Sequence, residues 1–243
     1  MSLVFPPLYA IIDADLLKTR LPEMPEGLMH ALSFAEMMAE SGVELLQYRD
    51  KTATSRQLFE VSRAMSAALS KFPSKFPSKP SSGDSFAPRF IVNDRADVAL
   101  LAGASGVHVG QHDLSVEDAR AIVGADRWVG VSTHTLEQVE AADRTSADYI
   151  AFGPVFPTAT KEKPDPVVGL NLLAGARLRT RKPLVAIGGI TLERAAETYR
   201  VGADSLAVAR DLLASANPRE RAKAFLAEAA RVGSSRAPEL GGH

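Results

Sequence analysis

The sequence contains no cysteine, and this absence removes several kinds of chemistry at once. Without thiols the chain has no disulfide bonds, no thiolate nucleophile and no cysteine-ligated metal centre. The absence of cysteine is consistent with a reducing compartment, so we expect a cytoplasmic location.

The sequence also lacks an excess of either charge and a long apolar run. It has 28 basic and 29 acidic residues, for a formal net charge of -1. No apolar stretch approaches the roughly 18 residues of a membrane-spanning helix. Residues 1–7 show neither the charged start nor the apolar core of a secretory signal. We therefore expect no membrane or nucleic-acid partner, and any anion site must be a local cluster of charges.

What the sequence does contain is a regular alternation of short apolar runs and single amphipathic segments. The runs predict strands at residues 8–12, 43–49, 89–93, 106–109, 128–131, 147–152, 183–187 and 202–208. Thr54, Ser115 and Thr191 are suited to cap helices that follow strands. Eight strand-helix units in one chain predict an α/β fold, a (β/α)8 TIM barrel of a single domain. A doubly wound open sheet is the alternative, but no Gly-x-Gly-x-x-Gly opens the first helix.

The predicted barrel domain covers residues 1–232, with three irregular segments. Residues 14–27 read as a long loop after the first strand. Residues 71–88 contain a tandem Lys-Phe-Pro-Ser and predict a mobile insertion, which lies opposite the active site because it precedes a strand. The last helix is expected to end near residue 231, and residues 233–243 predict a disordered tail.

Polar residues gather at the ends of the predicted strands. In a TIM barrel the loops after the strands open on one face, where active sites lie. The residues at these positions are Asp13, Gln47, Arg49, Lys51, Asn93, Asp94, Gln111, Asp113, Ser132, Thr158, Thr160, Lys161, Gly188 and Gly189. Cations, carboxylates and amide or hydroxyl donors therefore converge on one mouth.

This set of residues indicates chemistry on phosphates. Arg49, Lys51 and Lys161 can surround one polyanion. Asp94 and Asp113 can share Mg2+, which takes one or two carboxylates and fills its remaining positions with water and phosphate oxygens. The glycines after the seventh strand suit the phosphate cup that is common in this fold. Two anion sites predict a diphosphate substrate that meets a monophosphate substrate.

Each of these residues also has a structural interpretation. Asp13 can cap local backbone, and Asp94 can belong to a charge cluster at a helix start. Gln47 and Arg49 point the same way on their strand and can form a polar layer inside the barrel. His108 and His112 are interpreted as structural rather than as ligands. The coincidence of so many polar residues on one face favours the functional interpretation.

The ordered series of motifs resembles the thiamine-phosphate synthase family. The resemblance runs from Tyr9 to Leu226, and the motifs are Gln47-x-Arg49-x-Lys51, Asn93-Asp94, Gly110-Gln111-x-Asp113, Gly130-Val131-Ser132, Gly153-Pro154-x-x-x-Thr158-x-Thr160-Lys161 and Ala186-Ile187-Gly188-Gly189-Ile190. It implies that two small molecules, hydroxymethylpyrimidine diphosphate and thiazole phosphate, are joined into thiamine phosphate with release of diphosphate. It also implies a requirement for Mg2+ and a dissociative mechanism.

The resemblance assigns roles residue by residue. Asp94 and Asp113 match the metal ligands. Arg49, Lys51, Asn93 and Lys161 match the diphosphate-binding set, and Arg49, Lys51 and Lys161 are the residues expected to assist catalysis. Gln47 and Ser132 match the pyrimidine and diphosphate side, and Thr158, Thr160 and Gly189 match the thiazole-phosphate side.

The chain departs from the family pattern in two places. Ile12 stands where the family usually has threonine, and residues 209–212 read Ala-Arg-Asp-Leu where a Ser-Ala-Ile run is common. Two other functions stay open: a thiazole tautomerase on the same barrel, and a phosphate-ligand sensor without catalysis. The sequence leaves open whether the protein forms a homo-oligomer.

Overall fold

A closed barrel of eight parallel strands forms the centre of the computed structural model, which describes residues 5–20, 27–74, 87–158 and 166–236. The strands are β1 (Leu8–Asp13), β2 (Leu45–Arg49), β3 (Arg89–Asn93), β4 (Gly106–Val109), β5 (Trp128–Thr133), β6 (Tyr149–Phe152), β7 (Leu184–Ile187) and β8 (Ser205–Val208). They follow one another in chain order, and β1 pairs with both β2 and β8, which closes the ring. The predicted TIM barrel is confirmed, and the open doubly wound sheet is wrong.

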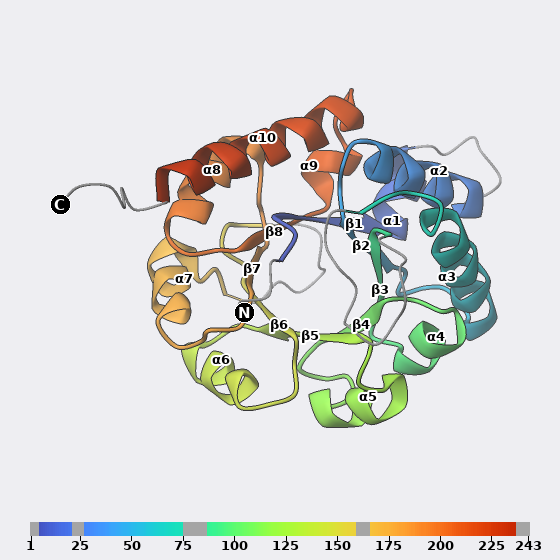
Figure 1. The fold of residues 1–243 in the computed structure, drawn as a ribbon, viewed down its shortest axis with the longest axis horizontal. Coiled ribbons are helices and arrows are strands. Elements are labelled where there is room, and N and C mark those ends of the chain that lie inside the picture. Colours follow the sequence, from blue (N-terminus) through green and yellow to red (C-terminus); the bar gives the residue numbers. More distant parts are fainter. Residues whose placement is uncertain (1–4, 21–26, 75–86, 159–165, 237–243) are drawn as a thin grey trace.

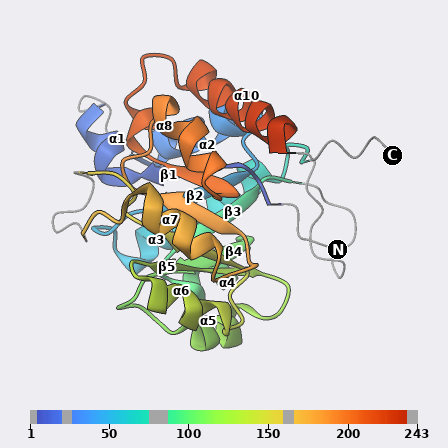
Figure 2. The same cartoon turned by 90° about the vertical axis from the view of Figure 1, so that its left-hand side faces the viewer.

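Helices surround the barrel, as Figure 1 shows. They are α1 (Ala14–Arg20), α2 (Gly27–Glu40), α3 (Ser55–Leu69), α4 (Ala96–Leu101), α5 (Val116–Val123), α6 (Leu136–Asp143), α7 (Gly169–Arg177), α8 (Leu192–Arg200), α9 (Arg210–Leu213) and α10 (Pro218–Arg236). In Figure 2, α10 lies alongside α8 and near α2, so the last helix packs against one of the first. No helix in the described part of the chain is long and apolar enough to cross a membrane.

Local sequence explains where several helices begin. Thr54 forms a capping box with Gln57 at the start of α3, and the Ser115 hydroxyl accepts a hydrogen bond from the Asp118 amide in α5. Thr191 occupies the cap position of α8 but makes no side-chain cap hydrogen bond. The predicted positions of all three caps are therefore correct, and two of them act through the side chain.

Two apolar layers stabilise the barrel. The outer layer lies between strands and helices and includes Leu8, Ala10 and Ile12 of β1. The inner layer fills the barrel and contains Phe5, Tyr9, Ile11, Leu45, Ile91, Trp128, Tyr149, Ala151, Val185 and Ala207. Because successive strand residues face opposite sides, β1 is buried along its whole length.

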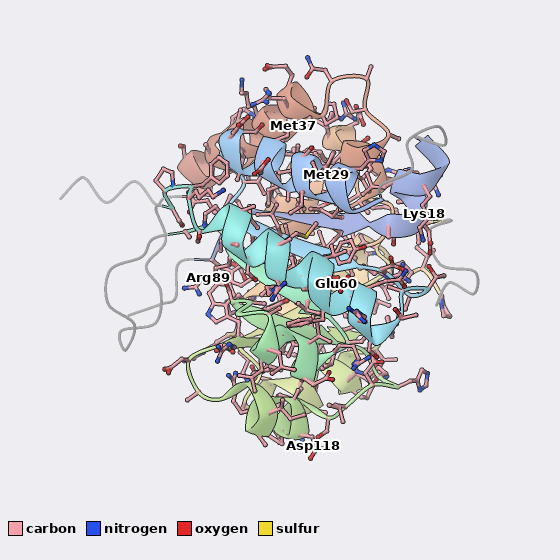
Figure 3. All side chains as sticks on the ribbon, turned by 90° about the vertical axis from the view of Figure 1, so that its right-hand side faces the viewer. Lys18, Met29, Met37, Glu60, Arg89 and Asp118 are labelled. Carbon is pink, nitrogen blue, oxygen red and sulfur yellow. The ribbon has the colours of Figure 1, made fainter. Side chains whose placement is uncertain are left out.

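Side chains fill the end of the barrel where the strands begin. The Phe5 ring stacks on Trp128 with centroids 5.1 Å apart. Figure 3 shows Lys18, on α1, and Arg89, the first residue of β3, at opposite ends of the molecule. Aromatic side chains therefore close the barrel at the end where β3 and β5 begin. The predicted functional residues lie at the other end, next to α1, where the strands stop.

The structure corrects two predicted boundaries. Residues 14–20 form α1 instead of a loop, because the Asp13 carboxylate accepts a hydrogen bond from the Leu16 amide and so begins a helix. The last helix continues to Arg236, past the predicted end at residue 231, so the predicted disordered tail from residue 233 is wrong for its first four residues. Ser234 and Ser235 hydrogen-bond carbonyls of the preceding turn.

Part of the predicted insertion falls outside the described residues. The structure does not describe residues 75–86 of the insertion, nor residues 237–243 at the chain end. The flanking residues are described: the Ser74 hydroxyl donates to the Glu44 carboxylate at 2.7 Å, and residues 87–88 lead directly into β3. Mobility of the insertion and its position opposite the active site stay predictions.

Gly130 in β5 gives a direct test of the inner layer. A Cβ at this position would lie 2.0 Å from Cζ of the buried Tyr149 ring. We expect Gly130→Ala to destabilise the protein by about 1–3 kcal/mol through overpacking. Gly233→Ala on α10 is the control, since its Cβ would meet nothing within 4 Å and alanine favours helix. Urea unfolding midpoints measure both, and equal midpoints for the two variants would contradict this packing.

Candidate active site

A cavity of about 700 Å3 opens at the end of the barrel where the strands stop. Eight of the residues predicted at the mouth line it: Asp13, Gln47, Arg49, Asn93, Ser132, Thr158, Gly188 and Gly189. Lining residues that the sequence did not predict include Tyr9, His108, His134, Arg194 and Arg221. Lys51, Asp94 and Asp113 are not among the lining residues, and Thr160 and Lys161 lie outside the described residues.

Arg49 is held at the mouth by a buried carboxylate. Its Nη1 lies 2.5 Å from Oδ2 of Asp13, whose side chain is only 3% exposed. The two residues are direct partners in the β1–β2 ladder, so the strand register brings them together. Asp13 also caps α1, which makes its structural interpretation correct. The other guanidinium donors of Arg49 face no acceptor in the described part of the chain and can bind an anion.

Lys51, Asp94 and Asp113 form an acidic cluster beside this cavity. The Lys51 ammonium pairs with the Asp94 carboxylate, and Oδ2 of Asp113 accepts from the Gly110 amide at 2.8 Å. Asp94 has a φ of 63°, in the left-handed region where residues other than glycine are uncommon. Strain of this kind is found at functional sites that the surrounding structure fixes firmly.

The Asp113 carboxylate lies close enough to the Asp94 carboxylate to affect its pKa. Burial raises the pKa of Asp94 above its usual range, the neighbouring Asp113 raises it further, and Lys51 opposes both effects. Two carboxylates from the ends of adjacent strands are a donor set that a hard divalent cation suits. No group of three or more potential metal ligands occurs among the described residues. The pair therefore fits an ion such as Mg2+ that takes its other ligands from water and substrate.

The turn after β7 has backbone geometry that suits an anion. Gly188 and Gly189 have φ values of 95° and 62°, and a Cβ on Gly189 would lie 2.5 Å from the Pro157 carbonyl oxygen. The amide N–H groups of Gly189 and Ile190 have no acceptor within the described chain. Successive free N–H groups in such a turn make a concave site for an anion.

Arginines surround this glycine turn. Arg194 donates to the Gly189 carbonyl at 2.7 Å, and its guanidinium lies 4.5 Å above the centroid of the Phe156 ring. Arg221 pairs with Asp211 at 2.8 Å and with Glu193 at 2.9 Å, so its charge is neutralised. Arg210 begins α9, lines the cavity and is exposed. Its guanidinium has no partner in the described part of the chain, so its positive charge is available to a ligand.

Polar side chains also form the floor of the cavity. Gln47 donates to the Tyr9 hydroxyl at 2.6 Å, and His108 Nε2 lies 2.8 Å from the Ser132 hydroxyl. Burial raises the pKa of Tyr9 above its usual value, so the phenol stays protonated. Gln47 therefore belongs to an internal polar layer and lines the cavity as well, and both interpretations of this residue hold.

Several cavity residues are not predicted from the sequence, and they differ in how clearly their sequence positions indicate the cavity. Tyr9 lies four residues before the predicted mouth residue Asp13 on β1, so strand alternation places its side chain toward the interior as well. His108 lies on β4, two residues before the motif that starts at Gly110. Arg194 lies in the first turn of α8, directly after the glycine turn that follows β7, so its place near the mouth could have been found. Arg221 lies in the first turn of α10, and nothing in the sequence links that helix to the mouth.

Comparisons with known proteins give one consistent result. A family model described as thiamine monophosphate synthase matches residues 21–212. The thiamine-phosphate synthase of Koribacter versatilis (strain Ellin345) is 45% identical over 226 residues, which is 93% of this chain and 96% of the relative. The thiamine-phosphate synthase of Chlorobium phaeovibrioides (strain DSM 265 / 1930) is 40% identical over 197 residues, covering 81% of this chain and 88% of the relative.

Solved structures agree with the sequence comparison. A thiamine phosphate pyrophosphorylase from Pyrococcus furiosus superposes with a TM-score of 0.75 at 28% identity, covering 93% of this chain and 96% of that one. A thiamine phosphate pyrophosphorylase from Bacteroides thetaiotaomicron has a TM-score of 0.60 at 15% identity and covers 92% of this chain and 98% of that one, which supports the fold alone. The matched family model and the close relatives together place this chain in the thiamine monophosphate synthase family.

Proposed function

We propose that this chain is a transferase that joins 4-amino-2-methyl-5-hydroxymethylpyrimidine diphosphate to thiazole phosphate, forming thiamine phosphate and releasing diphosphate. The observation that carries the proposal is the presence of two anion-binding regions around one cavity. The first region contains Arg49, the last residue of β2, and the cluster of Lys51, Asp94 and Asp113 that follows strands β2, β3 and β4. The glycine turn and Arg210 follow β7 and β8. Because β3 and β7 are four strands apart in a ring of eight, the regions face each other.

The first region suits the departure of diphosphate. When the carbon–oxygen bond breaks, the electron pair leaves with the diphosphate and the pyrimidine methylene carbon becomes a cation. Arg49, Asn93 and Ser132 line the cavity on this side and can donate hydrogen bonds to the departing oxygens. The lone pair of the thiazole nitrogen then forms the new carbon–nitrogen bond. No protein nucleophile is needed in this sequence of events.

Asp94 and Asp113 are the residues that would hold Mg2+ here. Bound beside the diphosphate, the ion would neutralise part of the charge that develops on the leaving group. The Asp113 carboxylate lies close enough to Asp94 to raise the pKa of Asp94, which supports this assignment, and the family resemblance supports it independently. Lys51, which pairs with Asp94, adds a positive charge to the same cluster.

The second region suits a phosphate monoester. The amide N–H groups of Gly189 and Ile190 can bind phosphate oxygens, and Arg210 can add a charged hydrogen bond. Thr158 lines the same side of the cavity. Roles for Thr160 and Lys161 rest on the family resemblance. The cytoplasmic location and a homo-oligomeric state also stay predictions.

The experiment that tests this function is a diphosphate-release assay with each substrate omitted in turn. We expect diphosphate and thiamine phosphate in equal amounts only when both substrates and Mg2+ are present. Tight binding of thiazole phosphate without diphosphate release would instead identify a sensor. Isomerisation of a thiazole phosphate alone would identify a tautomerase, and either result would contradict the proposal.

Removing one metal-binding carboxylate should nearly abolish turnover. Asp113→Asn keeps the size of the side chain but removes its charge, and we expect kcat to fall by at least about a hundredfold, the usual cost of losing one preorganised electrostatic contact. Excess EDTA should stop the wild-type reaction, and added Mg2+ should restore it. Asp126→Asn, just before β5 at the other end of the barrel, is the matched control. Wild-type activity in Asp113→Asn or in EDTA would refute the metal assignment.

Arg210 should affect only the monophosphate substrate. We expect Arg210→Ala to raise the KM for thiazole phosphate about tenfold or more, because a hydrogen bond to a charged group is lost. The KM for the pyrimidine diphosphate should stay within about twofold, since that substrate's diphosphate binds across the cavity. Arg181→Ala, an exposed arginine before β7, serves as control. Steady-state kinetics with each substrate varied distinguish the two constants, and an unchanged KM for thiazole phosphate would exclude a role for Arg210.

A further inference from the structure

A chain of hydrogen-bonded side chains crosses the barrel beneath the cavity. It begins at Gln47, whose Nε2 donates to the Tyr9 hydroxyl at 2.6 Å. The Tyr9 and Tyr149 hydroxyl oxygens are 2.9 Å apart, and the Tyr149 oxygen lies 3.1 Å from Nδ1 of His108. His108 Nε2 lies 2.8 Å from the Ser132 hydroxyl. The chain therefore joins Gln47 to Ser132, two residues that line the cavity.

This chain is shielded from water along its middle. Tyr9 and Tyr149 are 1% and 0% exposed, and His108 is 6% exposed. The His108 ring stacks on Tyr149 with centroids 5.5 Å apart. Burial raises the pKa of both phenols, so each carries one proton. In such surroundings a hydroxyl proton without an acceptor is costly, which restricts how the protons can be arranged.

With the Gln47 amide nitrogen on the Tyr9 hydroxyl, as in this structure, only one direction of donation satisfies every hydroxyl of the chain. Tyr9 accepts from Gln47, and its only other partner in the described part of the chain is the Tyr149 hydroxyl. Tyr9 must therefore donate to Tyr149. Tyr149 has already accepted that bond, so its own proton goes to His108 Nδ1. In the reverse direction the Tyr9 proton would be buried without an acceptor.

The direction of the chain fixes the state of both its ends. Because Nδ1 of His108 accepts a hydrogen bond, the proton of the neutral imidazole resides on Nε2 and is donated to Ser132. The Ser132 hydroxyl then keeps its own proton for a group in the cavity. At the other end, the Gln47 amide nitrogen is engaged by Tyr9, which leaves its carbonyl oxygen to accept from a ligand.

We propose that this buried chain presets Ser132 as a hydrogen-bond donor and Gln47 as an acceptor, with His108 as a positioning residue in its Nε2–H form. The part that concerns substrate rests on the proposed function. An acceptor at Gln47 suits the exocyclic amine of the aminopyrimidine, and a donor at Ser132 suits an oxygen of the departing diphosphate. Neither end has to reorient when the pyrimidine substrate binds, so the polar groups are preorganised.

The state of His108 can be measured without turnover. In protein labelled with 15N-histidine, the two ring nitrogens give separate NMR signals, and the signals lost in His108→Gln identify this residue. We expect the wild-type protein to show the neutral Nε2–H tautomer. Tyr149→Phe removes the donor to Nδ1 and should give a mixture of tautomers. Tyr199→Phe removes another buried hydroxyl, one that donates to the Pro7 carbonyl at 2.8 Å, and should leave His108 unchanged. An Nδ1–H tautomer in the wild type, or an unchanged tautomer in Tyr149→Phe, would overturn the proposal.

Kinetics test whether the chain serves the reaction. We expect Tyr149→Phe to lower kcat/KM for the pyrimidine diphosphate about tenfold, the effect of one oriented hydrogen bond, without changing the KM for thiazole phosphate. His108→Gln can still donate an amide N–H toward Ser132 and should retain more activity than the shorter His108→Asn. Equal losses in the two histidine variants, both folded by circular dichroism, would count against a positioning role. Failure of the wild type to release diphosphate would refute the proposed function, whereas the tautomer result stands by itself.

Discussion

In a closed parallel barrel every second residue of each strand faces one shared interior, and the functional part of this molecule depends on that constraint. It places Tyr9 and Asp13 of β1 on the same side as Gln47 and Arg49 of β2, in a ladder where Asp13 and Arg49 are direct partners. A shift of one residue would turn all of these side chains toward the helices. The inner apolar layer therefore secures the positions of the polar groups above it.

Charge is arranged so that the two sides of the mouth are not equivalent. Near β2 to β4, the cations Arg49 and Lys51 are paired with carboxylates, so an incoming polyanion meets a region of balanced charge. Near β7 and β8, Arg221 is neutralised by Asp211 and Glu193, whereas Arg210 remains available. A region with paired carboxylates can accept a metal ion together with a diphosphate. A region of amide groups with the Arg210 guanidinium suits a single phosphate, and under the proposed function this difference would order the two substrates in the cavity.

The sequence predicted most of the fold because its strands are short apolar runs that end in polar residues. It failed at residues 14–20, where the helix depends on a cap from Asp13 that periodicity does not reveal. The predicted end of the last helix is also too early, because the small and polar residues near Gly233 are typical of a disordered chain end. Site residues on strand ends could be predicted, since the barrel gathers them by rule. Arg221 could not, because only the packing of α10 brings it to the mouth. Arg194 lies in the first turn of α8, five residues after Gly189, so it is near the mouth by the same rule although it lies outside the strand ends.

The buried polar chain shows how a structural interpretation and a functional one can both be correct. The sequence favours a structural role for His108, and its ring is indeed buried and stacked on Tyr149. Its Nε2 nevertheless reaches Ser132 at the cavity surface. A buried network with every donor satisfied is rigid, and rigidity at the floor of an active site orients the groups above it.

The proposed function requires that two phosphate groups bind on opposite sides of one cavity. A crystal structure of the protein with thiamine phosphate, diphosphate and Mg2+ is the decisive measurement. We expect the monophosphate at the amide groups of Gly189 and Ile190 with Arg210, and the diphosphate at Arg49 with the ion on Asp94 and Asp113. Both groups on the same side of the cavity, or a monophosphate away from the glycine turn, would contradict it.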